Sequence, residues 1–341
     1  MHRPRLVSLR ISALLASLAL SALALESCRI APRERTRVSA ALVRAQEFLA
    51  QELAQWHAEE RCASCHHDGD AARVLWSIDA GFDALREARL AEHRDRLLRS
   101  SLWCDPQGDP RFRDERLALV QRAAALQAAL ARGARIDVGA VETLLDALRR
   151  QQEEPGCWLG STTSGLGGPV TYGPFLATAL AISVLQDRAD GASAEAVRRG
   201  RAWFASASPS ATLEHAAVAW ALAAPRDAHE RAARDRSVAA LLARAQRSGG
   251  FAPWEEGSSE VFDTALALLA LEAQPASPAI MRACAAARGY LEREQELDGG
   301  WRETTRPAGG ESRAHRVSTS AWAAQALAAS HHPMPRSSLE R

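Results

Sequence analysis

The feature that most constrains the fold is a short motif that occurs three times in the second half of the chain. In each copy a glutamine is followed by a glycine and then by a tryptophan. The copies are Gln152, Gly156 and Trp158; Gln246, Gly250 and Trp254; and Gln295, Gly299 and Trp301. The glutamines stand 94 and 49 residues apart, close to two periods and one period of 47. A recurrence of this length predicts an array of similar structural units.

Each residue of the motif has a physical interpretation. A glutamine in the last turn of a helix can donate hydrogen bonds to the free carbonyl groups there, and a following glycine can end the helix in the left-handed conformation. The tryptophan is expected to fold back and join one unit to the next. An Ala-rich apolar helix follows each copy, for example from Tyr172 to Leu185 and from Ser318 to Ala328. The pattern therefore predicts that each unit contains one helix with an apolar face.

Beyond Val38 the pattern is almost entirely helical, because Ala, Leu, Arg, Glu and Gln dominate and alternation typical of strands is absent. The predicted helices span 38–60, 71–84, 85–100, 112–132, 138–152, 172–187, 192–206, 211–224, 227–247, 259–273, 277–295 and 315–330. If 71–100 holds two helices, these helices pair into six hairpins. The prediction is an all-α chain.

The spaced motifs resemble the QW repeats of the squalene cyclase and protein prenyltransferase family. The resemblance covers residues 138–330 well and the diverged repeats at 38–132 weakly. It implies an (α/α)6-type toroid of about six helical hairpins over 38–330. Repeats of this kind predict a fold rather than an activity.

The resemblance does not extend to the family's active sites. Its class II cyclases protonate an alkene with a D-x-D-D motif, and the nearest string here is Asp68-Gly69-Asp70. Its prenyltransferases bind zinc through an Asp, a nearby Cys and a distant His, and the C-terminal half lacks that pattern. Asp263 and Glu214 are the candidate acids, although we expect both to be structural or lining groups. The inner helices offer only scattered aromatic residues, namely Trp76, Tyr172, Phe175, Trp220, Phe262 and Trp322.

The N-terminus has the pattern of a secretory signal, with arginines before Ile11 and an uncharged apolar run to Leu25. Cys28 follows a sequence that resembles a bacterial lipobox, although Glu26 is atypical, and cleavage after Ala24 is the alternative. We therefore expect a signal peptide at 1–28, a linker at 29–37 and a disordered tail at 331–341. The expected location is the periplasm or cell envelope, and the expected membrane contact is only an N-terminal lipid or signal anchor.

Cys62, Cys65 and His66 form a C-x-x-C-H string, which is typical of covalent haem c attachment. The two thiols would bind the haem and His66 would bind its iron, with His57 or His93 as a sixth ligand or with five-coordinate iron. Three alternatives remain. The cysteines can form a disulfide, they can hold zinc with His66 or His67 and Cys104, or the string can be the diverged turn after helix 38–60.

Composition excludes several classes of protein. Lys and Arg total 42 against 41 Asp and Glu, a net charge of +1, so the chain lacks the basic excess of a general nucleic-acid binder. No lysine is present, which excludes a Schiff base and a Walker-type phosphate site.

Three functional hypotheses follow. The first is an exported toroid that lacks cyclase chemistry and acts as a binding or redox-associated module, with its cofactor at Cys62, Cys65 and His66. The second is a diverged terpenoid-cyclase-like enzyme acting on an isoprenoid. The third is a structural scaffold. The expected partner is an unidentified protein or an apolar small molecule.

Overall fold

The computed structural model describes residues 32–60, 63, 65–78, 95–96, 98, 115–159, 167–304, 306 and 312–329. The chain divides into two compact units, Met1–Ala40 and Ala41–Arg341, and the second contains the helical rings. The predicted signal at 1–28 and the predicted tail at 331–341 lie outside the described residues. Helix α2 begins at Pro32, inside the segment expected as a linker at 29–37, so residues 32–37 are helical.

The described elements are almost all α-helices. They are α2 (Pro32–Glu59), the π-helix η1 (Cys65–Ala71), α3 (Ala72–Ser77), α5 (Glu115–Ala131), α6 (Val138–Arg150), α7 (Gly173–Leu185), α8 (Gly191–Ser206), α9 (Thr212–Ala221), α10 (Ala228–Arg244), α11 (Val261–Glu272), α12 (Pro278–Glu294) and α13 (Arg313–Ala329). Among the described residues, no helix is both long enough and apolar enough to cross a membrane.

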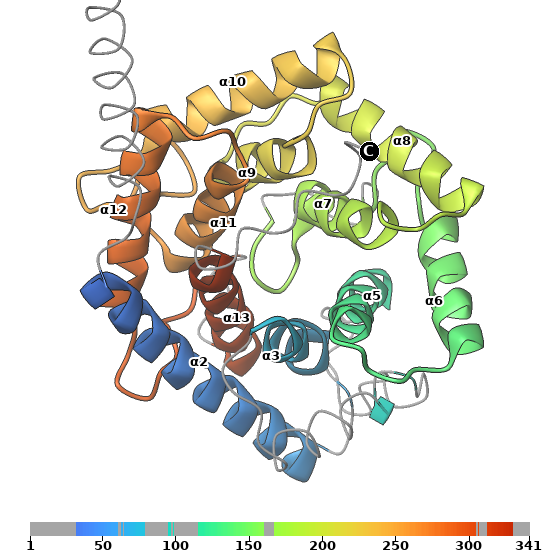
Figure 1. Ribbon diagram of the computed structural model, residues 1–341, viewed down its shortest axis with the longest axis horizontal. Helices are drawn as coiled ribbons and strands as arrows, with labels where there is room; N and C mark the ends of the chain where they lie inside the picture. The colour runs from blue at the N-terminus through green and yellow to red at the C-terminus, as the bar shows by residue number, and fades with distance from the viewer. Residues whose placement is uncertain are drawn as a thin grey trace, which may run out of the picture. The chain divides into compact units, whose positions relative to one another are not determined.

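From Ala41 onward the helices form two concentric rings (Figure 1). The inner ring consists of α3, α5, α7, α9, α11 and α13, and the outer ring contains α2, α6, α8, α10 and α12. Inner and outer helices alternate along the chain, which confirms the predicted toroid. The outer partner expected for α5, over 85–100, lies outside the described residues apart from 95, 96 and 98.

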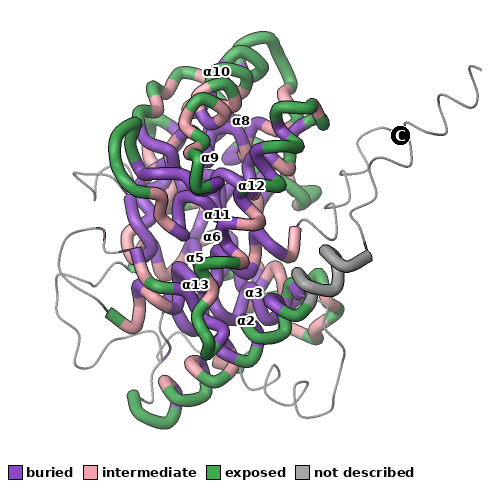
Figure 2. Tube along the Cα trace, turned by 90° about the vertical axis from the view of Figure 1, so that its left-hand side faces the viewer, coloured by how far each residue is buried: buried purple, intermediate pink, exposed green. Residues whose placement is uncertain are grey.

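Burial follows the two rings. Ten of the twelve residues of α11 are buried, against four of the seventeen in α10. Figure 2 shows the same contrast between the inner helices and the solvent side of α10 and α12. A helix that is apolar on all sides is stable only when it is enclosed, whereas an amphipathic helix can cover a surface. The Ala-rich sequences therefore occupy the inner ring.

The first inner helix departs from the expected pattern. The residues from Cys65 to Ala71 form the π-helix η1, which runs directly into α3. His66 and His67 are therefore in a helix, so the alternative that placed them in a diverged turn after 38–60 is wrong. At Gly69 an added Cβ would lie 2.8 Å from the Cβ of Gln121, so glycine permits η1 to contact α5 closely. Single π-helical turns are frequent at functional sites.

The first and last repeat motifs have matching geometry. Gln152 Nε2 donates to the carbonyls of Gly156 and Ala196, each at 2.8 Å, and so joins its own turn to the next outer helix. Gln295 Nε2 donates in the same way to Gly299 and Ala41, each at 2.9 Å. The last motif thus binds the first outer helix of this unit. The indole nitrogens of Trp158 and Trp301 donate to carbonyls of their own outer helices, at Leu148 and Leu291.

The middle copy is shifted by one residue. Its left-handed glycine is Gly249 (φ 88°), which corresponds to Gly156 and Gly299, and not Gly250. Ala245 pairs with Phe251 as Gln295 pairs with Trp301. Gln246 instead donates to the carbonyl of Gly257 at 2.8 Å. Phe251 is fully buried whereas Trp254 is 50% exposed, so assigning Trp254 to the join between units was wrong.

The sequence predicts that the motif glycine ends its helix, and the structure shows a different role for it. Each left-handed glycine closes a turn after its helix has ended, since Gly249 N–H donates to the Gln246 carbonyl and Gly299 N–H donates to Glu296. The helices α10 and α12 end earlier, at Arg244 and Glu294. A Cβ at Gly299 would lie 2.3 Å from the carbonyl oxygen of Arg44, so only glycine fits where the turn contacts the neighbouring outer helix.

Candidate functional site

The most connected buried carboxylate is Asp70, at the end of η1. Its Oδ1 accepts a hydrogen bond from the Tyr172 hydroxyl. Its Oδ2 accepts from Gln121 Nε2 at 2.9 Å and from Ser318 Oγ at 2.7 Å. These donors lie on α5, on α13 and just before α7, so one carboxylate joins four elements of the inner ring. The guanidinium of Arg73 lies 3.7 Å from Oδ1.

Aromatic side chains gather beside Asp70 around Trp322. The ring centroid of Trp322 lies 5.8 Å from Tyr172, 6.2 Å from Trp220 and 6.4 Å from Phe262, each in an edge-to-face arrangement. The Arg73 guanidinium stacks on the Trp322 ring, 4.3 Å from its centroid. We call these four aromatic residues and Arg73 the hub. The expectation that the inner aromatics are scattered is therefore wrong for these four, while Phe175 packs outward against Trp203.

Tyr172 is held in an unusual backbone conformation. It is a non-glycine residue with φ 57°, it precedes α7, and Gly173 after it also has positive φ. The Tyr172 hydroxyl donates to Asp70 and accepts from Trp322 Nε1 at 3.0 Å. Burial, and then the neighbouring Asp70 carboxylate, raise the pKa of Tyr172 well above its ordinary value. Positive φ at such a residue persists only when surrounding contacts enforce it, and these hydrogen bonds supply that constraint.

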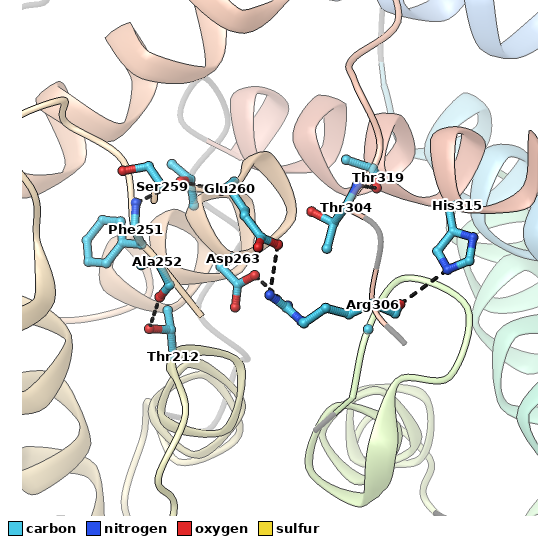
Figure 3. A network of polar contacts seen from close by, with 12 residues as sticks. Thr212, Phe251, Ala252, Ser259, Glu260, Asp263, Thr304, Arg306, His315 and Thr319 are labelled. Atoms are coloured by element: carbon cyan, nitrogen blue, oxygen red, sulfur yellow. Dashed lines mark hydrogen bonds and ion pairs between the residues drawn. The ribbon is translucent and has the colours of Figure 1, made fainter. Parts of the chain in front are cut away.

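A second buried carboxylate, Asp263, lies in the first turn of α11 (Figure 3). Its Oδ2 accepts from Arg306 NH2 at 2.6 Å, and the same guanidinium donates from NH1 to Glu260 at 2.8 Å. Within the described residues, Asp263 Oδ1 has no hydrogen-bond partner. Arg306 is itself held by its carbonyl, which accepts from His315 Nε2 at 3.2 Å.

Burial controls the ionisation of this pair. Desolvation raises the pKa of Asp263, and the Arg306 guanidinium opposes that effect without reversing it. Burial likewise raises the pKa of Glu260, against Arg306 and with a contribution from Asp263. A raised carboxyl pKa favours the neutral acid. Asp263 thus combines one oxygen held by a cation with one oxygen that accepts no bond from the described residues.

Glu214, the other candidate acid, has a structural role. Its Oε2 accepts from the backbone N–H groups of Ser210 and Ala211 and from the Ser210 hydroxyl. These bonds cap the start of α9, where backbone N–H groups have no partner within the helix. His215 is buried behind it, near Ser237. Of the two predicted acids, only Asp263 has a buried oxygen without a hydrogen-bond partner among the described residues.

The described part of the C-x-x-C-H string lies against the Asp70 site. His66 is buried, and its Nδ1 lies 3.4 Å from Gln121 Nε2 and 3.9 Å from Asp70 Oδ2. His67 faces a different neighbour, since its ring stacks on Trp56 with centroids 4.3 Å apart. Burial, followed by the nearby His66, lowers the pKa of His67 well below its ordinary value, which keeps it neutral.

The proposed metal ligands are only partly described. Cys62 and Cys104 lie outside the described residues, as does His93, and the side chain of Cys65 is not described. His57, the other candidate iron ligand, is 2.7 Å from Asp68 Oδ1. Among the described residues, no three His, Cys, Asp or Glu side chains converge into a group able to hold a metal ion. Haem and zinc at this string stay predictions.

Solved structures share this architecture. The type II terpene cyclase MstE from Scytonema matches with a TM-score of 0.59 at 18% identity, over 87% of this chain and 99% of that chain. The fold is a terpene-cyclase-like α/α toroid. An MstE variant in complex with its product, merosterolic acid A, gives a TM-score of 0.57 at 17% identity over 85% and 97% of the two chains. A protein from Actinoplanes gives 0.51 at 16% identity over 85% and 98%.

Sequence comparison adds no family to this result. No protein-family profile and no curated protein sequence matches the chain. At 16–18% identity these structures show the fold alone, because a fold does not determine a function. The site must therefore be interpreted from its own contacts.

Proposed function

We propose that this toroid binds an apolar molecule of the isoprenoid class and does not cyclise it. The observation that carries the proposal is the hub, where three aromatic side chains from different inner elements pack edge-to-face on Trp322 and a buried guanidinium stacks on the same ring. Aromatic rings supply large apolar contact areas for a hydrocarbon chain. The structural neighbours support the ligand class, because MstE structures contain geranylgeranyl dihydroxybenzoate as substrate and merosterolic acid A as product.

The position of Arg73 in the hub argues against cyclisation. A cyclase that forms a carbocation benefits from aromatic faces that attract cations. Here the Arg73 guanidinium is already stacked on the Trp322 ring. That ring face is therefore occupied by a resident cation and is not open to a carbocation.

The buried carboxyl groups near the hub also argue against cyclisation. Protonating an alkene requires a carboxyl group kept in its acid form by its surroundings. Both oxygens of Asp70 already accept hydrogen bonds from protein donors, three in total, and Arg73 lies 3.7 Å away. The chain contains no D-x-D-D string that would cluster further carboxylates beside it.

The test uses the purified full chain and geranylgeraniol as the probe. Intrinsic tryptophan fluorescence measures binding, and gas chromatography with mass spectrometry of the recovered lipid detects conversion. We expect saturable binding and unchanged geranylgeraniol. Trp322→Phe should weaken binding severalfold, whereas Trp254→Phe, at a half-exposed position, serves as the matched control and should not. A cyclised product would overturn the absence of cyclisation, and absence of binding would overturn the ligand class.

A second candidate function is acid catalysis by Asp263. It is favoured by the combination of a raised pKa and an oxygen without a partner among the described residues. In this proposal Oδ1 donates its proton to an alkene carbon, which leaves a carbocation, and Arg306 stabilises the carboxylate that remains. The cyclised carbocation then loses a proton, which gives the neutral product and restores the acid. Turnover of geranylgeranyl dihydroxybenzoate that is lost in Asp263→Asn but kept in Glu214→Gln would establish it. Equal turnover in both variants would reject it.

A cofactor at Cys62, Cys65 and His66 is a separate proposal. A ligating imidazole is usually oriented by a contact at its other nitrogen, and the position of Asp70 and Gln121 at Nδ1 of His66 fits that arrangement. Haem c would supply redox chemistry there, whereas zinc would be structural. Chain produced with cytochrome c maturation proteins should give a pyridine haemochrome spectrum, and metal analysis of the same sample would detect zinc. A colourless, metal-free product would reject both.

Export and lipid attachment are also proposed from the sequence. Labelling with palmitate in a bacterial host, compared with Cys28→Ala, tests whether Cys28 is the lipid anchor. An unlabelled chain recovered from the periplasm would favour ordinary cleavage after Ala24.

A further inference from the structure

Arg73 is a buried cation whose hydrogen-bonding capacity is largely unused. Its side chain is 8% exposed, and NH1 donates to Gln325 Oε1 at 3.3 Å. Within the described residues, Nε and NH2 have no hydrogen-bond partner. Leaving donors of a buried charged group unmatched is costly. Parallel N–H groups of a guanidinium are suited to binding one oxygen-bearing group from a ligand.

An acceptor without a partner lies on the other side of Asp70. Gln121 is fully buried, and its Nε2 donates a hydrogen bond to Asp70. Its Oε1 has no donor among the described residues. Arg73 and Gln121 therefore flank the same carboxylate, at 3.7 Å and 2.9 Å, and offer donors and an acceptor respectively. A ligand group that bonds to both side chains must accept a hydrogen bond from Arg73 and donate one to Gln121.

The charges select the kind of group. The carboxylate of Asp70 and the guanidinium of Arg73 cancel, so the site is balanced without a ligand. A carboxylate or diphosphate would add negative charge close to Asp70, and a like charge that near costs binding energy. A hydroxyl group adds no charge, accepts from Arg73 and donates to Gln121.

We propose that Arg73 and Gln121 form the head-group subsite of the toroid, and that it selects isoprenoid alcohols over the corresponding acids and hydrocarbons. The apolar chain would then pack against the aromatic side of the hub, where Trp322 is stacked on the same guanidinium. This inference rests on the proposed function, since it names the head group of the ligand proposed there.

The test compares four probes of similar chain length on the full-length wild-type protein. They are geranylgeraniol, its methyl ether, geranylgeranoic acid and the parent hydrocarbon. Sites that hydrogen-bond a ligand hydroxyl reject analogues that lack it, so we expect the alcohol to bind at least about tenfold more tightly than the hydrocarbon. The ether, which accepts but cannot donate, should fall between them. The acid should bind more weakly than the alcohol at pH 7.

Variants test whether Arg73 is responsible for the preference for the alcohol over the hydrocarbon. Arg73→Met should reduce the alcohol-to-hydrocarbon ratio to about two or less, and Arg73→Lys should retain part of it because an ammonium still donates. Arg132→Met is the matched control, because that arginine binds the Trp76 carbonyl outside the subsite, and it should keep the wild-type ratio. Melting curves check folding. If Arg73→Met does not fold, the wild-type probe series and Arg73→Lys still decide the outcome.

The possible failures are distinguishable. Equal binding of alcohol, ether and hydrocarbon would overturn the head-group subsite and leave the proposed ligand class intact. Tighter binding of the acid would overturn the selection of a neutral group. If none of the four probes binds, the proposed function fails and this inference fails with it.

Discussion

Asp70 and Asp263 are both fully buried carboxylates near the N-terminal ends of inner helices, yet their surroundings differ. Asp70 receives three hydrogen bonds from neutral donors, and a guanidinium lies 3.7 Å away. Asp263 receives one short bond from Arg306, which it shares with Glu260, and one of its oxygens has no partner among the described residues. In the first arrangement both oxygens are held by protein donors, and in the second one oxygen accepts no bond from the described residues.

The comparison shows that burial alone does not define an acid. Desolvation favours the neutral form of any carboxyl group, and hydrogen bonds donated to the charged form oppose it. Asp70 is a structural centre of the inner ring because its donors come from three other elements. Among the described residues, Asp263 is bound by one cation, Arg306. The variants below should separate these roles.

Asp70→Asn should have the largest effect. The amide would present an N–H group to donors that now bind an oxygen, and it would leave the buried Arg73 without its nearby carboxylate. Removing one partner of a buried ion pair costs about 3–5 kcal/mol, so we expect a loss of that size in the free energy of unfolding. Urea denaturation followed by circular dichroism measures it. A loss below about 1 kcal/mol would show that Asp70 does not hold the ring together.

Tyr172→Phe should have the next largest effect. It removes the hydroxyl that donates to Asp70 and accepts from Trp322, while the ring still contacts Trp322. Leaving buried partners unsatisfied costs about 1–3 kcal/mol, again measured by urea denaturation. Tyr290→Phe is the matched control, because that hydroxyl bonds the Ser259 carbonyl at a less buried position. A smaller loss in Tyr172→Phe than in the control would contradict the role of the hub.

The sequence predicts the double ring well, because the inner helices are distinguished by composition. Alanine and leucine fill both faces of α11, whereas charged residues cover α10, and this contrast is visible without coordinates. The repeat spacing then determines how many hairpins to expect. Both signals depend on local sequence and regular recurrence.

The repeat motifs were harder to place at single-residue precision. Gln246 looks equivalent to Gln152 and Gln295, but the turn is aligned by its left-handed glycine, and that residue is Gly249. Aligning on the glycine with positive φ would have assigned Phe251 to the buried aromatic position. The sequence contains two adjacent glycines there, and only backbone geometry decides between them.

The Asp70 site could not be predicted because its members share no local pattern. Gln121, Tyr172 and Ser318 are 51, 102 and 248 residues away from Asp70. Closure of the ring brings them together, and no spacing rule in one sequence encodes that. The Asp68-Gly69-Asp70 string was noted only for its difference from D-x-D-D. Asp263 was found because it is an acid at the start of an apolar helix.

Asp263→Asn should have a smaller effect on stability that depends on pH. The variant loses a charge-assisted bond to Arg306, but that guanidinium keeps Glu260, and the cost of burying a carboxylate disappears. We expect a net change of about 1 kcal/mol at pH 7. Because the folded-state pKa is raised, folding favours the protonated acid, so its contribution is fully present below the ordinary value of 3.8. It decreases as pH rises from there through the raised folded pKa.

Urea denaturation from pH 3.5 to pH 7 checks this sign. The stability of wild type minus that of Asp263→Asn should fall as pH rises. A difference that grows with pH would mean that Arg306 lowers the pKa of Asp263 more than burial raises it. The proposal that Asp263 acts as an acid would then lose its basis.

Glu260→Gln should have the smallest effect, and it tests whether the two carboxylates at Arg306 are equivalent. The Glu260 side chain is 31% exposed and that of Asp263 is fully buried. Partly exposed ion pairs contribute about 0–1 kcal/mol, so we expect a loss within that range. Removing Glu260 also removes a negative neighbour of Asp263 and frees Arg306 to bind Asp263 alone. The pH dependence attributed to Asp263 should therefore shift to lower pH in Glu260→Gln, and an unchanged profile would show that the two acids titrate independently.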